Sequence, residues 1–563
     1  MKKVFLFLAL ASLCTISSFG QLSVEHSYSI SKINPANDTT FPGGRGVNQL
    51  VMYTEHYGKS TTGTNDYGVE AVVRNGIVVA IGGNNSRIQK GRIILSGHGT
   101  ARAWLLENAK IGADITIRDS IAVSRFDVSS FRFFARVRLP ELEKKFRVMK
   151  AVLSARERRK IFMQLAVIRA MSRQSAVKQT RETADEFIAR GIHMIDRTDY
   201  LITASPKVEG RGAWHRPDET TTAQVNATVK KFVRAGFNML FVETVWGGET
   251  IYPGAITEQK QKFKGFDPLQ AFIDAGKKYG VKIHAWVHTF FVGHAGPGNG
   301  KSIGPVLTHH PEWALVKRNG EKISRAEDGY LYVCPARPEV QNYLASLYHE
   351  ICVKYPGLGG VQLDYVRYPV NSSLEESSCY CDYCRSAFKK FSGVDPLDID
   401  PASHPKEWKT WQRWREDNIT RFVKRVREEN PKVIFSADVF PDIEEARKTK
   451  MQDWALWARK RYIDFLAPMI YTPNALQVKT SVAGIRAVAG KNFPVYAGLA
   501  PFLNLTPEIL LKEIESARSL STRGVILFAT QSLSDEQLNL FAAGPFRTAA
   551  ATGVSQLYHD HQK

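Results

Sequence analysis

The sequence predicts an α/β protein whose largest part is a (β/α)8 barrel of the TIM type, preceded by a small β-rich module and a basic helical connector. Eight apolar, β-branched runs recur after residue 206 and helical patterns separate them, which is typical of such a barrel. The length of 563 residues exceeds one ordinary domain, so additional units are expected. The hydrophobic content of 44% is that of a folded chain and excludes a disordered one.

The first 20 residues have the pattern of a secretory signal peptide. Lys2 and Lys3 precede an apolar run at 4–13, and small residues follow up to Gly20, after which we expect cleavage. Lipidation at Cys14 is the weaker alternative, because Leu13 stands where a small residue is expected. No other run reaches the ~20 apolar residues of a membrane span. The mature protein is therefore expected to be exported, to the periplasm or the extracellular space, with no transmembrane span.

The formal net charge of +21 indicates contact with acidic surfaces. For an exported protein, such surfaces are anionic envelope polymers rather than nucleic acid. A contribution to solubility alone is the alternative.

Residues 21–122 form the expected β-rich module. Short strand-like runs with turn residues between them lie at 49–53, 61–65, 68–73, 76–80 and 92–95. The segment Ile94-Leu-Ser-Gly-His-Gly-Thr-Ala-Arg-Ala-Trp-Leu105, with Gly112-Ala-Asp-Ile-Thr116 after it, resembles the N-terminal part of the phosphodiester glycosidase domain. The part that would complete that domain is not recognisable. We therefore expect a structural or binding remnant and transfer no catalytic residue to it.

Residues 123–198 form the expected basic helical connector. Arg and Lys interleave with apolar residues at helical spacing, as at Leu165 and Ile168, and Gly and Pro are scarce. A solvated face of a helical hairpin and a face for a membrane surface or an anionic polymer are the two interpretations.

The barrel is expected over 199–545, with a C-terminal tail at 546–563. Strands are predicted at 212–215, 238–245, 282–291, 360–365, 433–440, 464–471, 495–499 and 524–530. Helices are predicted at 222–235, 267–279, 338–354, 408–429, 453–460 and 507–518. An open doubly wound sheet is disfavoured, because no glycine-rich phosphate loop follows the first strand.

Polar and aromatic residues gather where these strands end. In a (β/α)8 barrel the C-terminal ends of the strands form the active-site face. A mixture of carboxylates and aromatic rings suits a carbohydrate, because sugar rings stack on aromatic faces while their hydroxyls bond to polar groups. The expected substrate-binding residues at these ends are Trp214, His215, Trp286, His288, Tyr365, Arg367 and Tyr471.

Six ordered blocks resemble the glycosyl-hydrolase-like family 10 domain. They are Arg211-Gly-Ala-Trp-His215, Asn238-Met-Leu-Phe-Val-Glu-Thr244 with Tyr252-Pro253, His284-Ala-Trp286, His310-Pro-Glu-Trp313, Gln362-Leu-Asp-Tyr-Val-Arg-Tyr-Pro369 and Ala467-Pro-Met-Ile-Tyr471. The resemblance spans about residues 205–545. It implies a barrel fold and a glycan hydrolase, and it is the source of the suggestion that the substrate is the glycan strands of peptidoglycan.

Glycosidic cleavage needs two carboxyl groups, one that protonates the leaving oxygen and one that attacks the anomeric carbon or activates water. Asp364 ends the fourth strand and is the first candidate, with Arg367 expected to lower its pKa and hold it ionised. A structural ion pair between these two residues is the alternative. The second carboxyl is Asp438 on the fifth strand, if burial raises its pKa, or Glu243 on the second strand. Related chains often carry Gln at the position of Glu243, which favours substrate binding there.

Three cysteines crowd together at Cys379, Cys381 and Cys384. Their spacing suits structural zinc, with His404 or another residue as the fourth ligand. A local disulfide, or a bridge to Cys334 or Cys352, is the alternative. No cofactor is expected to be required for catalysis.

The leading hypothesis is an exported glycoside hydrolase that acts on an envelope or environmental polysaccharide. A non-catalytic glycan-binding barrel is the second hypothesis, and a phosphodiester glycosidase centred on the N-terminal module is the third. A second carboxyl group about 5–9.5 Å from Asp364 discriminates the first from the second.

Overall fold

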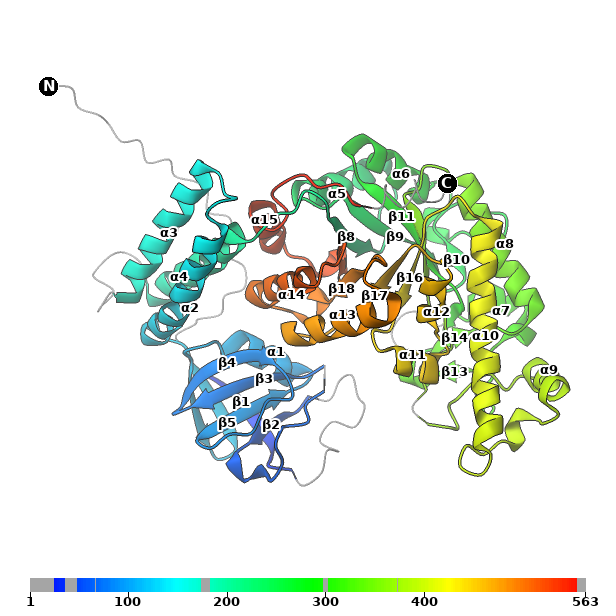
Figure 1. Cartoon of the computed structure of the whole chain (residues 1–563), viewed down its shortest axis with the longest axis horizontal. Helices are drawn as coiled ribbons and strands as arrows, with labels where there is room; N and C mark the ends of the chain where they lie inside the picture. The colour runs from blue at the N-terminus through cyan, green and yellow to red at the C-terminus, as the bar shows by residue number, and fades with distance from the viewer. Residues whose placement is uncertain are drawn as a thin grey trace. The chain divides into compact units, whose positions relative to one another are not determined.

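The computed structural model describes residues 25–35, 48–65, 67–173, 183–296, 302–371 and 373–553. The predicted signal peptide at 1–20 and the end of the predicted tail lie outside the described residues. The chain divides into two compact units, Met1–Ile202 and Thr203–Lys563 (Figure 1).

The first unit contains a small closed β-barrel with strand order β1-β2-β5-β3-β4-β6-β7. Alternating apolar residues such as Val69, Ala71 and Val73 point into its core. The run predicted as a strand at 61–65 is not one, since only Thr61 forms an isolated bridge, to Arg87. The strands are β1 (His26–Ile33), β2 (Leu50–Tyr53), β3 (Val69–Arg74), β4 (Ile77–Gly83), β5 (Arg92–Gly97), β6 (Asp114–Arg118) and β7 (Ile121–Arg125), with α1 (Thr100–Asn108) between β5 and β6.

Three helices follow in the region predicted to be helical: α2 (Val128–Met149), α3 (Ala155–Arg173) and α4 (Ala184–Ile202). Asp127 caps α2 by accepting hydrogen bonds from the N–H groups of the next turn. The rings of Phe131 and Phe187 pack edge to face, 5.5 Å apart between centroids. Leu165 and Ile168 of α3 are buried, whereas Phe162 on the same helix is 65% exposed.

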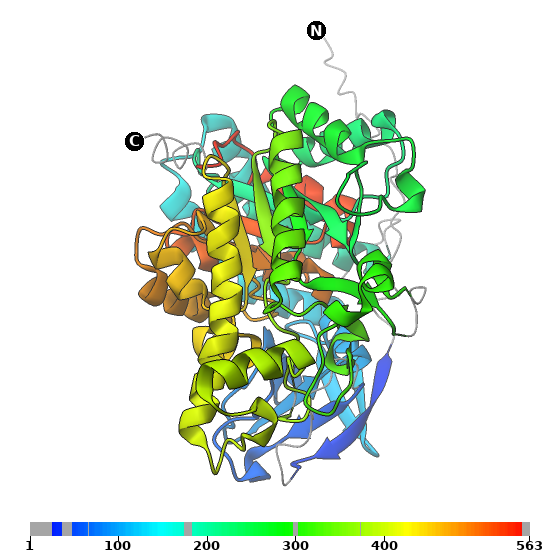
Figure 2. The ribbon, with the colours of Figure 1, turned by 90° about the vertical axis from the view of Figure 1, so that its right-hand side faces the viewer.

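The second unit is a parallel eight-stranded barrel, so the predicted fold class is confirmed (Figures 1 and 2). The strand order is β17-β16-β15-β11-β9-β8-β19-β18, and the bridges Leu466–Val495 and Met469–Gly498 join the two edges. The strands are β8 (Gly210–His215), β9 (Met239–Trp246), β11 (Lys282–His288), β15 (Gly360–Asp364), β16 (Phe435–Val439), β17 (Phe465–Pro468), β18 (Tyr496–Leu499) and β19 (Gly524–Phe528).

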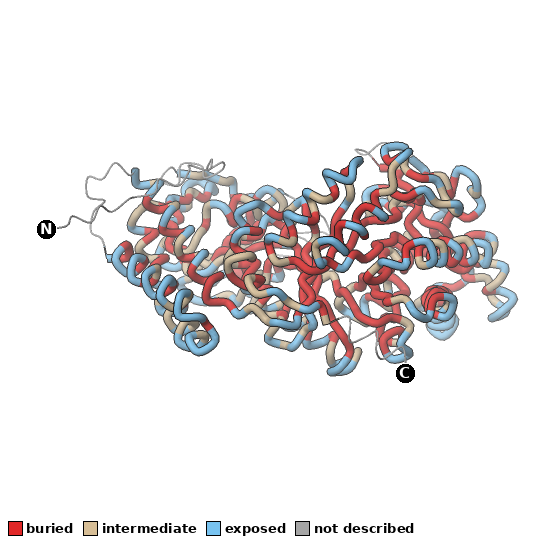
Figure 3. The backbone as a smooth tube through the Cα atoms, turned by 90° about the horizontal axis from the view of Figure 1, so that it is seen from above, coloured by how far each residue is buried: buried red, intermediate tan, exposed pale blue. Residues whose placement is uncertain are grey.

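The helices cover the outside of this barrel. Each predicted helix is present: α5 (Thr222–Arg234), α6 (Pro268–Tyr279), α8 (Pro338–Lys354), α10 (Pro405–Glu429), α12 (Trp454–Arg459) and α14 (Pro507–Ser519). Further helices not predicted from the sequence are α7 (Gly304–His309), α9 (Asp382–Ser392), α11 (Ile443–Lys450), α13 (Ala475–Ala489) and α15 (Asp535–Ala543). Buried residues concentrate in the strands, while the helices expose one face (Figure 3). Among the described helices, none is long and apolar enough to cross a membrane.

The third predicted strand, 282–291, ends early. β11 stops at His288, and β12 (Phe291–His294) belongs to a separate antiparallel sheet with β14 (Tyr330–Tyr332) and β13 (Ile323–Ser324). A short strand, β10 (Glu249–Thr250), pairs antiparallel with the end of β9. These additions lie in the connections that follow barrel strands, at the same end as the predicted site.

The barrel interior is filled by large side chains, so it is a packed core and not a channel. Trp214, Phe241, Trp286 and Phe465 are all at most 1% exposed. Gly498 leaves room for the Trp214 ring, because a Cβ atom there would lie 3.0 Å from that ring. This packed layer forms the floor beneath the C-terminal strand ends.

Candidate active site

Asp364 is the last residue of β15 and faces the barrel interior. Gln362, two residues earlier on the same face, accepts a hydrogen bond from Trp214 Nε1 at 2.7 Å. Asp364 Oδ2 accepts one from Trp286 Nε1 at 2.9 Å, and Oδ1 accepts one from the Tyr365 backbone N–H at 2.6 Å. Asp364 is only 6% exposed, and the hydrogen bond from Trp286 of the neighbouring strand β11 fixes the orientation of its carboxyl group.

His288 brings Asp364 and Glu243 together. Its Nε2 lies 3.6 Å from Asp364 Oδ2 and 3.7 Å from Glu243 Oε1. Those two oxygens are therefore at most about 7.3 Å apart, the sum of the two distances, which lies below the upper limit for paired glycosidase carboxyls. Burial, assisted by Arg216 and Lys260, holds the pKa of His288 well below its usual range, so the imidazole is neutral.

Asp438 lies on β16, the strand next to β15. The pairing of Leu363 with Ala437 places Asp438 level with Asp364. It is 2% exposed, and its Oδ1 has no hydrogen-bond partner among the described residues. Burial, reinforced by the Asp364 charge, raises the pKa of Asp438 well above its ordinary value. This carboxyl favours the protonated form, as the sequence analysis required of a proton donor.

Arg367 pairs with another carboxylate and acts on Asp364 only from a distance. Its guanidinium pairs with Glu327 at 2.7 Å and stacks over the Tyr365 ring, 4.8 Å from the centroid. Burial raises the pKa of Asp364, and Arg367 opposes this shift only in part. Arg367 thus lowers the pKa of Asp364 as expected, but burial outweighs it, so the pKa lies above its ordinary value. The alternative ion pair between the two residues is not formed.

Arg216 is the cation that the sequence analysis missed. Its Nε donates to Glu243 Oε1 at 3.1 Å, and its guanidinium lies over the Trp286 and Phe528 rings. Burial raises the pKa of Glu243, while Arg216 and Lys260 oppose the rise. Because Arg216 directly follows β8, its position at a strand end was a usable signal.

Partly exposed aromatic rings surround these polar groups. Tyr471 stacks on Phe528 with 5.6 Å between centroids and meets Phe502 edge to face. The Tyr365 ring lies 4.7 Å from His288 and 5.9 Å from Tyr330 between centroids. Of these rings, the sequence analysis named Tyr365 and Tyr471. The others stand in connections whose course the sequence pattern did not indicate.

Three predicted substrate-binding residues are placed away from this rim. Trp214 and Trp286 are each 1% exposed and support Gln362 and Asp364 from below through their N–H groups. His215 alternates with Trp214 and points out of the barrel, where its ring packs on Phe272 of α6 and bonds to Glu219 and Thr530. The structure does not bring His215 together with the carboxyl groups.

The barrel region matches a known protein family. Residues 194–496, more than half of the chain, match the model of the Glycosyl hydrolase-like 10 family. The chain belongs to this family. The matched region contains all three candidate carboxyl groups but not the module at 21–122, and the resemblance of that module to phosphodiester glycosidases is not confirmed.

Curated relatives of this Glycosyl hydrolase-like 10 protein include proteins described as glycosyl hydrolase DigH, from Escherichia coli K12 and from Shigella flexneri. Each is 25% identical over 318 residues, which cover 50% of this chain and 65% of the relative. The chain thus spans just under two thirds of the length of these relatives.

Similar solved structures include the catalytic domain of a beta-amylase from Paenibacillus polymyxa, with 13% identity and a TM-score of 0.44 over 64% of this chain and 100% of that one. An alpha-L-fucosidase isoenzyme 2 from Paenibacillus thiaminolyticus has 14% identity and a TM-score of 0.41 over 60% and 49% of the two chains.

Four cysteines of the Glycosyl hydrolase-like 10 region form a buried cluster. Cys379, Cys381 and Cys384 are joined by Cys334, and the four sulfur atoms lie within 4.8 Å of one another. These four and Cys352 are free thiols, so none of the predicted disulfides is observed. His404, the suggested fourth ligand, is exposed and placed beside the Asp400 backbone instead.

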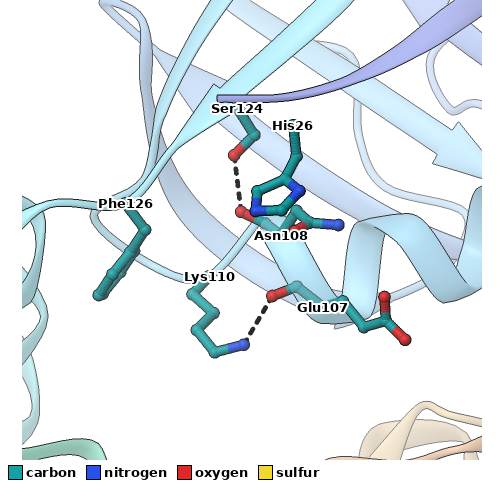
Figure 4. Close-up of a pocket in the computed structure, with 6 residues that line it drawn as sticks. All are labelled: His26, Glu107, Asn108, Lys110, Ser124 and Phe126. Carbon is teal, nitrogen blue, oxygen red and sulfur yellow. Dashed lines mark hydrogen bonds between the residues drawn. The ribbon is translucent and has the colours of Figure 1, made fainter. Parts of the chain in front are cut away.

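A small pocket in the first unit is not a second candidate site for a glycan. It is lined by His26, Glu107, Asn108, Lys110, Ser124 and Phe126 (Figure 4). Ser124 and Lys110 both donate to backbone carbonyls within it. Its volume of ≈ 10 Å³ is about that of one water probe, too small for a sugar.

Proposed function

We propose that this chain is an exported glycoside hydrolase that cleaves O-glycosidic bonds of an envelope or environmental glycan with a pair of carboxyl groups. The observation that carries the proposal is the placement of Asp364 and Asp438 at the C-terminal ends of neighbouring strands, in different surroundings. The family resemblance makes the glycan strands of peptidoglycan the first substrate to examine.

Each carboxyl has a distinct role in this proposal. Asp364 accepts two hydrogen bonds, which favour its ionised form, and it acts on the anomeric carbon or on the attacking water. Asp438 does not accept two such hydrogen bonds, and burial favours its protonated form. It donates this proton to the glycosidic oxygen as the bond to the anomeric carbon breaks. The chemistry is complete without a metal or an organic cofactor.

Glu243 is the competing second carboxyl. It lies within reach of the same histidine as Asp364, but the Arg216 guanidinium pairs with it and favours its ionised form. We assign Glu243, together with His288, to hydrogen bonding with sugar hydroxyls. Tyr365 and Tyr471 provide the aromatic faces on which sugar rings stack.

The proposal is tested by the release of reducing ends from purified peptidoglycan strands and a panel of polysaccharides. Asp364→Asn is expected to lower the rate about 10²–10⁴-fold, as removal of a catalytic carboxyl does. Asp442→Asn is the matched control, because Asp442 is an exposed cap of α11 and Asn caps equally well.

Full activity of Asp364→Asn would reject the assignment. Wild-type protein that binds a glycan but releases no reducing ends from any substrate would instead favour the non-catalytic glycan-binding barrel.

We also propose export and contact with anionic envelope polymers. The sequence pattern of 1–20 supports export, and N-terminal analysis of the mature protein should find Gln21 first. Arg156, Arg159 and Lys160 gather on α3 beside the exposed Met163, which supports an electrostatic contact. Replacing the three cations by Gln should weaken salt-sensitive binding to an acidic polysaccharide without changing the hydrolysis of a neutral oligosaccharide.

A further inference from the structure

The buried thiol cluster joins two segments that are far apart in the sequence. Cys334 lies between β14 and α8, whereas Cys379, Cys381 and Cys384 lie in the connection after β15 and at the start of α9. All four side chains are at most 5% exposed. The cluster is therefore a built interior site and not a chance surface grouping.

The sulfur separations match a shared metal ion. Cys334 Sγ lies 3.3 Å from Cys384 Sγ and 3.7 Å from Cys381 Sγ. A disulfide would require roughly 2.05 Å. Four thiolates around a tetrahedral zinc ion, with Zn–S bonds of about 2.3 Å, lie roughly 3.8 Å from one another.

The backbone around the cluster stabilises ionised sulfur. Cys381 is the N-cap of α9 and Cys384 lies in its first turn, so the positive end of the helix faces these thiols. The backbone N–H of Val316 donates to Cys379 Sγ at 3.4 Å. N–H donors of this kind are typical partners of metal thiolates.

A buried cation supplies the independent observation. Arg415 of α10 is 1% exposed, and its Nε and Nη2 have no hydrogen-bond partner in the described part of the chain. Its one hydrogen bond goes from Nη1 to the Ser378 carbonyl, directly before the first cysteine of the cluster, at 2.5 Å. No carboxylate pairs with it among the ion pairs of the described residues. Its guanidinium also lies over the Trp408 and Trp411 rings, 5.5 and 5.0 Å from their centroids, but these rings carry no charge. A buried charge without an opposite charge beside it is destabilising.

The hydrogen bond to the Ser378 carbonyl places the Arg415 guanidinium beside the cluster, one residue before Cys379. Thiolates bound to a metal there would supply the missing negative charge. Zinc with four thiolates carries two net negative charges and would balance Arg415, with Arg337 as a second cation beside Cys334 and Cys381.

We propose that Cys334, Cys379, Cys381 and Cys384 bind one structural zinc ion, with Arg415 as its buried counter-charge. The ion fastens the connection after β15, the strand that ends in Asp364, to the segment before α8. This inference concerns the cluster alone and holds whether or not the barrel hydrolyses a glycan.

The metal content of the full-length protein, purified under reducing conditions, tests this proposal. Mass spectrometry of the metals should find about one zinc per chain. Cys384→Ser should lose the zinc, whereas Cys352→Ser, at a half-buried cysteine of α8 outside the cluster, should keep it. If Cys384→Ser does not fold, cobalt exchanged into the wild type provides the second readout, since it should give the absorption of tetrahedral thiolate-bound cobalt.

The counter-charge is tested separately. Arg415→Met should speed the transfer of zinc to a competing chelator and weaken its affinity about 10-fold or more, as changes next to metal ligands do. Arg425→Met, at a partly exposed arginine of the same helix α10 that pairs with Glu429, should leave the affinity unchanged.

Three results would overturn the proposal. They are a wild-type protein without bound metal and without the cobalt spectrum, zinc retained in folded Cys384→Ser, and an intact mass without reductant that shows disulfides among the four cysteines.

Discussion

Asp364 and Asp438 illustrate how surroundings give different properties to two identical carboxyl groups. Both are buried, and burial raises the pKa of each. Asp364 accepts hydrogen bonds from Trp286 and from the backbone, which oppose the rise, whereas Asp438 has a further rise from the charge of Asp364. Such a separation distinguishes a base from an acid in carboxyl pairs.

The first prediction concerns the dependence of kcat/KM on pH. Activity should fall at low pH as Asp364 takes up a proton, and this limb should lie above pH 3.8, the ordinary pKa of an Asp side chain. Activity should also fall at high pH as Asp438 loses its proton. Asp438→Asn should lower kcat/KM about 10²-fold or more and abolish the high-pH limb. Glu243→Gln should retain that limb. The opposite pattern in the two variants would identify Glu243 as the acid.

The second prediction concerns stability. A carboxyl whose pKa is raised in the folded state favours folding at pH below its unfolded value and loses that contribution as pH rises through the folded value. Asp438 is such a group, so Asp438→Asn should raise Tm by a few degrees at pH 7, and the gain should vanish near pH 3.8. Thermal unfolding at both pH values checks this. A Tm change of the same size at both would show that packing, not charge, causes it.

At the scale of elements, two barrel strands orient side chains of a third. Trp286 on β11 fixes Asp364 at the end of β15, and Trp214 on β8 fixes Gln362 one layer below. The orientations of Asp364 and Gln362 thus depend on a layer of buried tryptophans. This role requires no contact between the tryptophans and a sugar.

Trp286→Phe removes the N–H donor to Asp364 while keeping an aromatic ring. Loss of this bond should lower kcat/KM about 10-fold and move the low-pH limb to higher pH, since the bond favours the ionised carboxyl. Trp457→Phe is the control, because Trp457 of α12 donates to Thr420 of α10 and not to the carboxyl groups. An unchanged low-pH limb in Trp286→Phe would contradict this role.

The aromatic rim has its own prediction. Tyr471→Ala removes a ring face stacked on Phe528 and should raise KM for long glycans about 10-fold, equivalent to about 1.4 kcal/mol, with kcat little changed. Tyr471→Phe should behave like the wild type. A selective fall in kcat would instead place Tyr471 at the reacting atoms.

The sequence predicted elements whose signal is local. Apolar runs bounded by Gly and Pro marked all eight strands, and helix α8 was predicted with its observed bounds. Helix α13 was missed, although its buried residues Val478, Val482 and Ile485 recur at helical spacing. The sixth strand ends at Pro468, earlier than predicted, and Met469 beyond it forms only an isolated bridge to Gly498.

The candidate site was predictable as a set of strand ends but not as a set of contacts. Glu327 pairs with Arg367 from a connection that has little regular pattern. Cys334, which was considered only as a disulfide partner, joins the cluster as a free thiol. The spacing of these residues along the chain indicates neither contact. The outward orientation of His215 follows only once Trp214 is known to point inward.

At the scale of the whole molecule, the chain combines a Glycosyl hydrolase-like 10 region with an N-terminal unit that holds a closed β-barrel and a basic helical segment. The contact with acidic polymers that we propose from the net charge of +21 should weaken with salt. The activity that we propose, however, is the hydrolysis of glycosidic bonds at the C-terminal end of the barrel strands.

The most direct test of that claim is digestion of purified glycan strands in ¹⁸O-labelled water, followed by mass spectrometry of the fragments. Hydrolysis should place one ¹⁸O atom at each new reducing end, and Asp364→Asn should yield almost no fragments. Intact strands with the wild type, or fragments without incorporated water, would contradict the assignment of a glycoside hydrolase.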